Sequence, residues 1–406
     1  MKNRILHIIY KVLLCQMITL AAASCELIPI GMGPSHYDKV MLLYSAGHNS
    51  LSYYLKGDIE ELKNSPLPSN RDEDVVLVYS HFPDRGYSSP SSPTLIRLRS
   101  TKKTPVVVDT LCIYPEGTIS ASAEQLETVL SQVKEAFPAN SYGMIFSSHA
   151  TGYLPAEYFQ NHQEESGSAE WSTFSIGQDK VGTYGDYQSH EIDLPDFAES
   201  IPMHLDYVLF DACFMGGIEV AYELKDKVGK VGFSQTEVLA DGYCYGTLTS
   251  HILRDGEPDL ESVCTDFFNQ YEIQDGISQS ATISLVDCSR LAPLAELCRN
   301  LFEKYSEGLD NINSLNVQRF FRDDSHWFYD LESILVNAGI NDEELDELHR
   351  ALDSCVLYKA HTPKFMSEFA INTFSGFSMY LPCKGDEELD TFYKTLKWNK
   401  ETGLVN

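Results

Sequence analysis

The stretch DYVLFDACFMGGIEVAYEL, residues 206–224, passes from an apolar run into a cysteine and then into a helical pattern. Val208–Phe210 predict a buried strand, and the apolar residues of 214–222 recur at the spacing of one helix face. Cys213 is therefore expected at a junction between strand and helix. There, the unpaired N–H groups and the dipole of the helix would favour a thiolate by about 0.3–1 kcal/mol. The thiolate is the reactive form of cysteine.

A lone cysteine is more often a small buried hydrophobe than a nucleophile. With a free pKa of about 8.5, a catalytic thiol needs a nearby imidazole. Three histidines follow apolar runs, namely His48 after VMLLYSAG, His81 after VVLVYS and His149 after GMIFSS. The carboxyl ends of parallel strands share one edge of a sheet, so each of the three could stand near the thiol. Each also fits a hydrogen-bonded structural histidine, and the pattern does not choose among them.

The first 25 residues have basic side chains, an apolar stretch at Val12–Leu20 and a run of small residues. This is the layout of a secretory leader, and it is too short to span a membrane. Its end, LAAASC, is similar to a bacterial lipobox, so we expect Cys25 to be lipidated and to anchor an exported protein in a bacterial cell envelope. A plain cleaved signal peptide is the alternative. Residues 26–37 predict a tether.

The remaining length of about 370 residues predicts one large domain, 38–255, with an appended subdomain, 256–406. Acidic residues outnumber basic ones by 59 to 30, which argues against a nucleic-acid partner and favours basic substrates. The cysteines beyond the leader show no C-x-x-C spacing, so neither a zinc site nor a small disulfide scaffold is indicated. We expect no metal site.

From residue 39 onward, apolar strand patterns alternate with helical ones, which predicts a parallel sheet with helices on its faces. A long segment at 156–190, rich in Gly, Ser, Gln and acids, predicts a loop. After residue 256 the pattern becomes mostly helical. The expected strands are 39–45, 74–80, a hairpin within 94–114, the run ending at His149, 206–211, 227–234, 281–287 and 376–382, and the expected helices are 51–64, 120–137, 193–202, 258–272, 289–306, 312–336 and 342–357.

Six segments together carry a resemblance to a known family. They are LLYSAGHNSL, FSSHATGY, DACFMGG, FSQTEVLADGYCYGTL, SGFSMYLP and FYKTLKWNKETG, in this order within residues 39–400. This series resembles the clostripain family of cysteine peptidases, relatives of the caspases. The resemblance implies an α/β caspase-like sandwich with a mostly parallel central sheet flanked by helices, and a mainly helical C-terminal subdomain that contributes strands.

The resemblance implies that Cys213 is the nucleophile and that His149 handles protons, with His48 kept as the reserve candidate for the base. It also implies that the backbone N–H groups of Cys213 and Ala150 hold the oxyanion, where one donor is typically worth about 2.7–4 kcal/mol. The family usually has His-Gly-x-Gly, whereas this chain has alanine at position 150 and glycine at 152. If position 150 requires a positive φ, alanine costs about 1 kcal/mol or moves the donor away.

Two acids are candidates for substrate binding. Asp211 lies two residues before Cys213 and shares its face of the strand, and Asp241 matches the position of the family's pocket carboxylate. Two desolvated carboxylates in one pocket favour Arg or Lys as a ligand. The alternatives are a turn or capping role for Asp211 and a solvated turn acid at Asp241. Glu237 is a supporting acid.

Lys180 is the only lysine or arginine between His149 and Cys213. Relatives often cut themselves in this interval after a basic residue, so the resemblance implies cleavage of the Lys180–Val181 bond. A surface lysine in a mobile loop is the alternative.

We therefore expect a monomeric cysteine endopeptidase that cleaves peptides and proteins after exposed Arg or Lys, without a cofactor. Some relatives depend on calcium, for which the sequence shows no convincing loop. A non-catalytic surface-binding lipoprotein that keeps the fold is the main alternative, and Ala150 is the sequence argument for it. A metal-dependent hydrolase using His48, His81 and His149 has no supporting ligand spacing.

Overall fold

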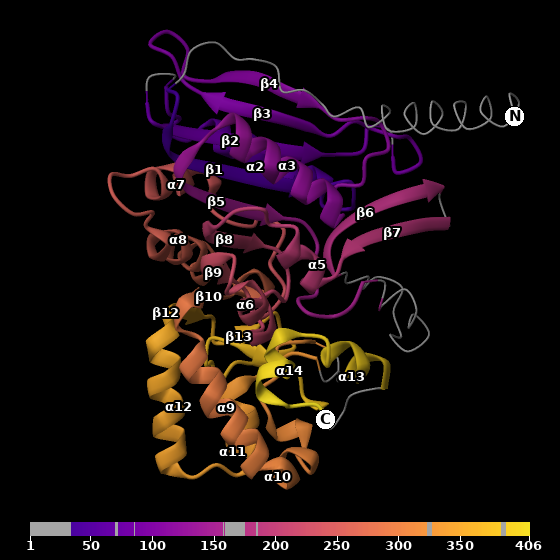
Figure 1. The fold of residues 1–406 in the computed structure, drawn as a ribbon, viewed down its shortest axis with the longest axis vertical. Helices are drawn as coiled ribbons and strands as arrows, with labels where there is room; N and C mark the ends of the chain where they lie inside the picture. Colours follow the sequence, from indigo (N-terminus) through magenta and orange to yellow (C-terminus); the bar gives the residue numbers. More distant parts are fainter. Residues whose placement is uncertain are drawn as a thin grey trace, which may run out of the picture.

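The computed structural model describes residues 34–69, 72–84, 86–156, 158, 175–183, 186–322, 327–382 and 387–406. In this part of the chain, nine strands form one central sheet in the order β12-β10-β9-β8-β5-β1-β2-β3-β4 (Figure 1). The five central strands are parallel, which confirms the predicted mostly parallel sheet. They are β1 (Tyr37–Ala46), β2 (Asp74–His81), β5 (Ala139–Ser147), β8 (Leu205–Asp211) and β9 (Val228–Phe233).

Both edges of the sheet are antiparallel. Beyond β2, the strands β3 (Thr94–Arg99) and β4 (Val107–Ile113) form the predicted hairpin. At the other edge, β10 (Thr282–Asp287) pairs with β9, and β12 (Val356–His361) pairs with β10. The region after residue 256 therefore supplies two strands to the same sheet as the N-terminal region.

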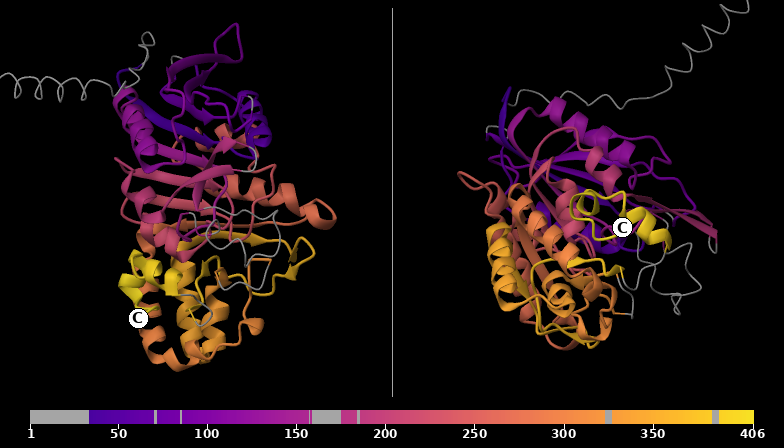
Figure 2. Two further views of the ribbon diagram at one scale, coloured as in Figure 1. Left: turned by 90° about the vertical axis from the view of Figure 1, so that its right-hand side faces the viewer. Right: turned by 60° about the horizontal axis from the view of Figure 1, so that its bottom comes forward.

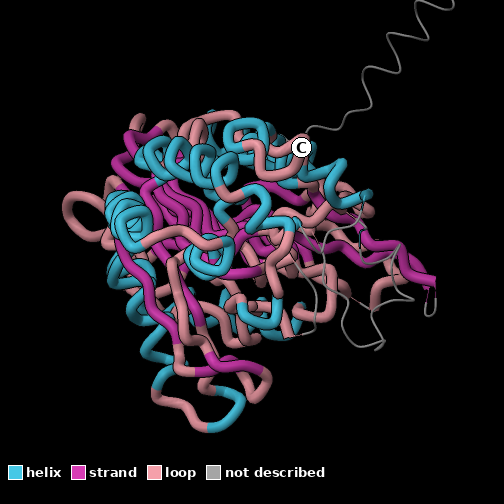
Figure 3. The backbone as a smooth tube through the Cα atoms, turned by 90° about the horizontal axis from the view of Figure 1, so that it is seen from below, coloured by secondary structure: helices cyan, strands magenta, loops and turns pink. Residues whose placement is uncertain are grey.

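Helices cover both faces of this sheet (Figure 3), because successive side chains of the buried strands point to opposite sides and both sides are apolar. In β1, Leu42 and Tyr44 belong to one hydrophobic core, and Met41 and Leu43 belong to a second core. The first core lies under α3 (Ala123–Ala136), α5 (Leu194–Glu199) and α6 (Ile218–Leu224), and the second under α2 (Ser52–Lys63), α7 (Tyr245–Ile252) and α8 (Leu260–Glu272).

The helices that follow β10 gather at one end of the molecule, drawn in orange and yellow in Figures 1 and 2. They are α9 (Ala292–Lys304), α10 (Ser306–Asp310), α11 (Leu331–Ala338), α12 (Asp342–Cys355), α13 (Glu387–Tyr393) and α14 (Lys397–Thr402). The 3-10 turn η1 (Gly276–Ser278) lies between α8 and β10. The short elements after β10 are η2 (Cys288–Arg290), η3 (Ser314–Asn316), β11 (Tyr329–Asp330), β13 (Lys364–Phe365), β14 (Phe369–Ala370) and β15 (Ser378–Met379).

Two expectations about elements are wrong. The segment predicted as a loop at 156–190 contains most of an antiparallel hairpin, β6 (Ile176–Thr183) and β7 (Asp186–Ile192), which projects from the body in Figure 1. Its glycines and acids conceal the strand pattern in the sequence. The helix predicted at 312–336 is present only as η3 and α11, because the aromatic residues between them pack as a loop against the core.

Candidate active site

The register of the sheet brings the two predicted catalytic residues together at the carboxyl ends of two neighbouring central strands. Parallel strands β5 and β8 pair Ser147 with Asp211, and His149 and Cys213 each follow two residues later. Both line a single pocket of about 270 Å³. The pocket is lined by Leu51, Leu55, Ser148, His149, Ala150, Asp211, Ala212, Cys213, Glu237, Val238, Leu239, Ala240 and Met366.

The surroundings of Cys213 differ from the sequence expectation. Helix α6 begins only at Ile218, after a capping residue at Gly217, so Cys213 does not lie at the first helical turn. Burial, followed by the charge of Glu237, raises the pKa of the Cys213 thiol to about 12. The Val238 N–H donates a hydrogen bond to Sγ at 3.3 Å. This bond favours the thiolate and lowers the pKa, but by less than burial raises it. The predicted stabilisation of a resting thiolate by a helix is therefore wrong.

His149 is held by a residue that the sequence analysis did not identify. The Ser50 Oγ lies 2.9 Å from Nε2 of His149 and holds one side of the imidazole ring. Burial, followed by the charge of Lys180, lowers the pKa of His149 to about 3. Thiol and imidazole are therefore both neutral near pH 7. The position of Ser50, directly after the strand and turn of the GHNSL motif, is the only sequence signal for this contact.

The backbone around the pocket explains the unusual motif at 149–152. Ala150 is not among the residues with positive φ, so the alanine is accommodated without left-handed strain. Positive φ angles occur instead at Gly152, with 62°, and at Phe214, with 59°. A Cβ at Gly152 would lie 2.5 Å from the carbonyl oxygen of Phe214. The second glycine of the motif is therefore the one that the geometry requires.

The predicted substrate-binding acids lie in different environments. Asp211 is buried and lines the pocket, where Oδ2 accepts hydrogen bonds from the Tyr245 hydroxyl at 2.7 Å and the Ser147 hydroxyl at 3.4 Å. Burial raises its pKa to about 6. Asp241 is exposed, so the expected desolvation of both carboxylates holds for Asp211 alone. Glu237 lines the pocket and is paired through both oxygens with Arg322.

Lys180 lies in strand β6 rather than in an irregular loop. Its N–H donates to the carbonyl of His48 at 2.9 Å, and its own carbonyl accepts from Nδ1 of His48 at 2.8 Å. The ring of His48 stacks on the ring of His81, with the ring centroids 4.6 Å apart. Val181, the residue after Lys180, is partly exposed and pairs with Gln188 of β7. His48 thus contacts the hairpin backbone and is not among the residues that line the Cys213 pocket.

Other predicted features lie elsewhere or outside the described residues. Cys25 and the rest of the leader lie outside the described residues. Among the residues the structure describes, no helix has the length and apolar character to cross a membrane, and no group of three or more His, Cys, Asp or Glu is arranged to hold a metal ion. Cys112 is disulfide-bonded, and six other described cysteines, including Cys213, are free thiols.

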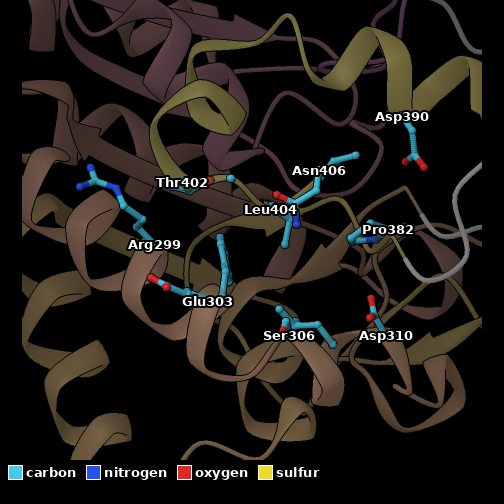
Figure 4. A pocket seen from close by; sticks show the side chains of 13 residues that line it. Arg299, Glu303, Ser306, Asp310, Pro382, Asp390, Thr402, Leu404 and Asn406 are labelled. Carbon is cyan, nitrogen blue, oxygen red and sulfur yellow. The ribbon is translucent and has the colours of Figure 1, made fainter.

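A larger pocket, of about 650 Å³, lies at the C-terminal end of the chain (Figure 4). Its lining includes Arg299, Glu303 and Asp310 beside the C-terminal residues, and Arg299 is paired with Glu401. Among the described residues that line it, there is neither cysteine nor histidine. The smaller pocket at Cys213 is therefore the candidate for thiol chemistry.

Comparisons with known proteins agree with this geometry. The model of the clostripain family matches residues 43–402. An inactive zymogen C11 protease from Parabacteroides distasonis is similar in structure, with a TM-score of 0.74, 26% identity, and coverage of 91% of this chain and 99% of that one. A secreted C11 cysteine protease from Bacteroides thetaiotaomicron, in complex with an irreversible peptide inhibitor, shares the fold with a TM-score of 0.73, at 23% identity over 90% of this chain and 99% of that one. No curated protein sequence shows significant similarity to the chain.

Proposed function

Because the chain belongs to the clostripain family of cysteine peptidases, we propose that it is an endopeptidase that cleaves after Arg or Lys by means of Cys213 and His149. The observation that carries this proposal is the shared pocket, which Cys213, His149 and the buried acid Asp211 all line. The pocket thus combines a nucleophile, a proton carrier and a site for a cationic side chain.

The neutral state of both groups at rest determines the order of the proton transfers. The thiol proton passes to His149 as the sulfur adds to the scissile carbonyl, because neither group is charged beforehand. The backbone N–H groups of Cys213 and Ala150 are the proposed donors to the oxyanion. The imidazolium then protonates the leaving amine, and the C–N bond breaks. Water, deprotonated by the same imidazole, releases the acyl group and restores the thiol.

Asp211 supports the preference for a basic residue before the cleaved bond. Its carboxyl is buried and lines the same pocket as the sulfur. A cationic side chain that enters this pocket gains a charge-assisted hydrogen bond, worth about 1.5–3 kcal/mol, that a neutral side chain does not gain. Asp241, which is exposed, is the proposed acid at the mouth of this site.

We further propose that the chain cuts its own Lys180–Val181 bond. The Lys180 side chain is half-buried, and its charge acts directly on His149. A lysine is therefore held beside the proposed catalytic centre before cleavage. When Lys180 leaves, one cause of the lowered His149 pKa is removed, and the imidazole accepts a proton more readily.

The proposed setting is the outer surface or periplasmic face of a bacterial envelope. A secreted C11 protease is among the structural neighbours, which is consistent with export. We propose that Cys25 carries a lipid anchor, that the chain acts as a monomer on peptides and proteins with exposed Arg or Lys, and that it needs no cofactor. Mass spectrometry of the mature N-terminus tests the anchor, which an unmodified Cys25 would exclude.

A labelled acyloxymethyl ketone with arginine at its recognition position tests the proposed chemistry. We expect it to modify Cys213 in the wild type, and not in Cys213→Ala, and we expect His149→Ala to slow the labelling strongly. A matched ketone with a neutral residue should label slowly. The absence of labelling in folded wild type would favour the non-catalytic binding protein. The sequence argument for that alternative was Ala150, which the backbone accommodates without strain.

A further inference from the structure

Helix α2 carries a buried acid that the sequence analysis did not identify. Asp58 lies on the inner face of the helix with Leu55, Ile59 and Leu62, and only 7% of its surface is exposed. Its Oδ2 atom is buried and accepts no hydrogen bond from any described residue. A buried carboxyl oxygen without a hydrogen-bond donor destabilises the folded chain, and a donor group that arrives from outside would satisfy it.

Asp58 is not itself among the residues that line the proposed substrate pocket, but it lies on the same buried face of α2 as a residue that does. Leu55, three residues earlier on the same helix face, lines that pocket together with Asp211. The first two residues of α7 connect Asp211 with helix α2 from the other side. The Tyr245 hydroxyl donates to Asp211, and the Gly246 N–H donates to Glu61 of α2 at 2.9 Å. Asp58 is therefore on the buried face of a helix that is tied to Asp211 through two adjacent residues.

The charges of described residues that act most strongly on Asp58 are negative. The charge of Asp211 has the largest effect on the pKa of Asp58, followed by the charges of Glu61 on the same helix and Asp241 in the loop before α7. Tyr245 of α7 also faces it. Burial, followed by the charge of Asp211, raises the pKa of Asp58 to about 9. Asp58 and Asp211 therefore share about one negative charge near pH 7, since two desolvated carboxylates disfavour each other's ionisation.

We propose that Asp58 is a specificity-determining residue, whose carboxyl joins that of Asp211 in binding the cationic side chain of the residue before the scissile bond. This inference rests on the proposed function. A guanidinium or ammonium group supplies the positive charge that the buried pair lacks and the donor that Oδ2 of Asp58 lacks. A neutral side chain supplies neither.

The proposal has a measurable consequence for protons. When a cation enters, the shared proton is expelled from Asp58, because both carboxylates then become ionised beside the positive charge. The affinity for a basic side chain should therefore increase as the pH rises from about 6 towards about 9. A neutral side chain binds without releasing a proton, so its affinity should be independent of pH over this range.

The variant Asp58→Asn tests the proposal, with Glu60→Gln as the matched control. Both variants lose one acid from the same helix, and Glu60 is exposed on the opposite side. The substrates are two fluorogenic peptides with arginine or its neutral isostere citrulline before the bond. In Asp58→Asn we expect the preference for arginine, measured as kcat/KM, to fall about tenfold through KM. Glu60→Gln should behave as the wild type.

Calorimetry separates binding from catalysis. In the Cys213→Ala background at pH 7.5, titration with the arginine peptide in two buffers of different ionisation enthalpy counts the released protons. We expect about one proton, and clearly fewer when Asp58→Asn is added. Because Asn is nearly isosteric with Asp, the thermal unfolding midpoint of the Asp58→Asn variant should not decrease, which shows that the variant is folded.

The outcomes separate the inference from the function on which it rests. A wild type that prefers arginine, with an Asp58→Asn variant that keeps this preference and the proton release, would overturn the role of Asp58 alone. A wild type that does not cleave after arginine at all would overturn the proposed function, and with it the inference.

Discussion

At the scale of single residues, the contact between Gly152 and Phe214 joins the histidine segment to the cysteine segment. Both residues have a positive φ, and the carbonyl of Phe214 occupies the space that a side chain at 152 would need. Phe214 is in turn held by Phe328, whose ring stacks on it with centroids 4.8 Å apart. The relative position of Cys213 and His149 therefore depends on a glycine at 152.

Because of this contact, substitutions at positions 152 and 150 should have very different effects on stability and activity. Gly152→Ala should lower the free energy of unfolding by about 2–4 kcal/mol, from left-handed strain together with the steric conflict, and should lower kcat/KM for an arginine peptide. Ala150→Gly should change stability by no more than about 1 kcal/mol and leave most activity intact. Urea unfolding and peptide kinetics measure both. Equal behaviour of the two variants would contradict this interpretation.

The residues of the site were predictable to different degrees. Cys213, His149 and Asp211 follow from strand ends and motifs, and the register of β5 and β8 brings them together. Ser50 and Asp58 were not predictable, because a serine in a turn and an acid in an amphipathic helix are ordinary surface patterns. The protonation state of Cys213 was also not predictable, since it depends on where α6 begins and on how deeply the thiol is buried.

At the scale of elements, the β6–β7 hairpin positions Lys180. Asp179, the residue before it, is fully buried, and its Oδ2 accepts from the Ser120 N–H and lies 3.3 Å from Nδ1 of His81. His48 holds both backbone groups of Lys180. A peptidase substrate must lie extended in the site, so β6 has to leave these partners before its bond can be cut.

Self-cleavage is tested by incubation and peptide mapping of purified variants. The wild type should yield two fragments separated between Lys180 and Val181, whereas Cys213→Ala and Lys180→Gln should stay intact at this bond. Asp179→Asn should be cut faster than the wild type, because it weakens the hold on β6 without changing Lys180. An intact hairpin in wild type that cleaves added peptides would remove the self-cleavage proposal.

The strands and helices could be predicted from the sequence where their side chains are strongly buried. The five parallel strands each contain a buried apolar stretch, and all were predicted close to their observed positions. The hairpin was missed because Gly177 and Gly182, both with positive φ, interrupt a strand of mixed polarity. The expected helix at 312–336 failed because the tertiary contacts of Phe320, Phe321 and Phe328 outweigh their local pattern.

At the scale of the whole molecule, the C-terminal region takes part in the site. Met366 lines the pocket, and Arg322 pairs with Glu237. Glu219 of α6 is fully buried and accepts hydrogen bonds from the Tyr380 N–H at 2.9 Å and the Tyr393 hydroxyl at 2.7 Å. The boundary near residue 255 stays a prediction. The pocket, however, is built from both sides of it, so functional tests require the full chain.

The most direct test of the central claim is the kcat/KM of the full chain for short fluorogenic peptides that differ only in the residue before the bond. We predict that arginine and lysine are preferred over neutral residues by about 10- to 100-fold and that Cys213→Ala abolishes all cleavage. A preference for neutral or acidic residues, or cleavage that survives the loss of the thiol, would contradict it.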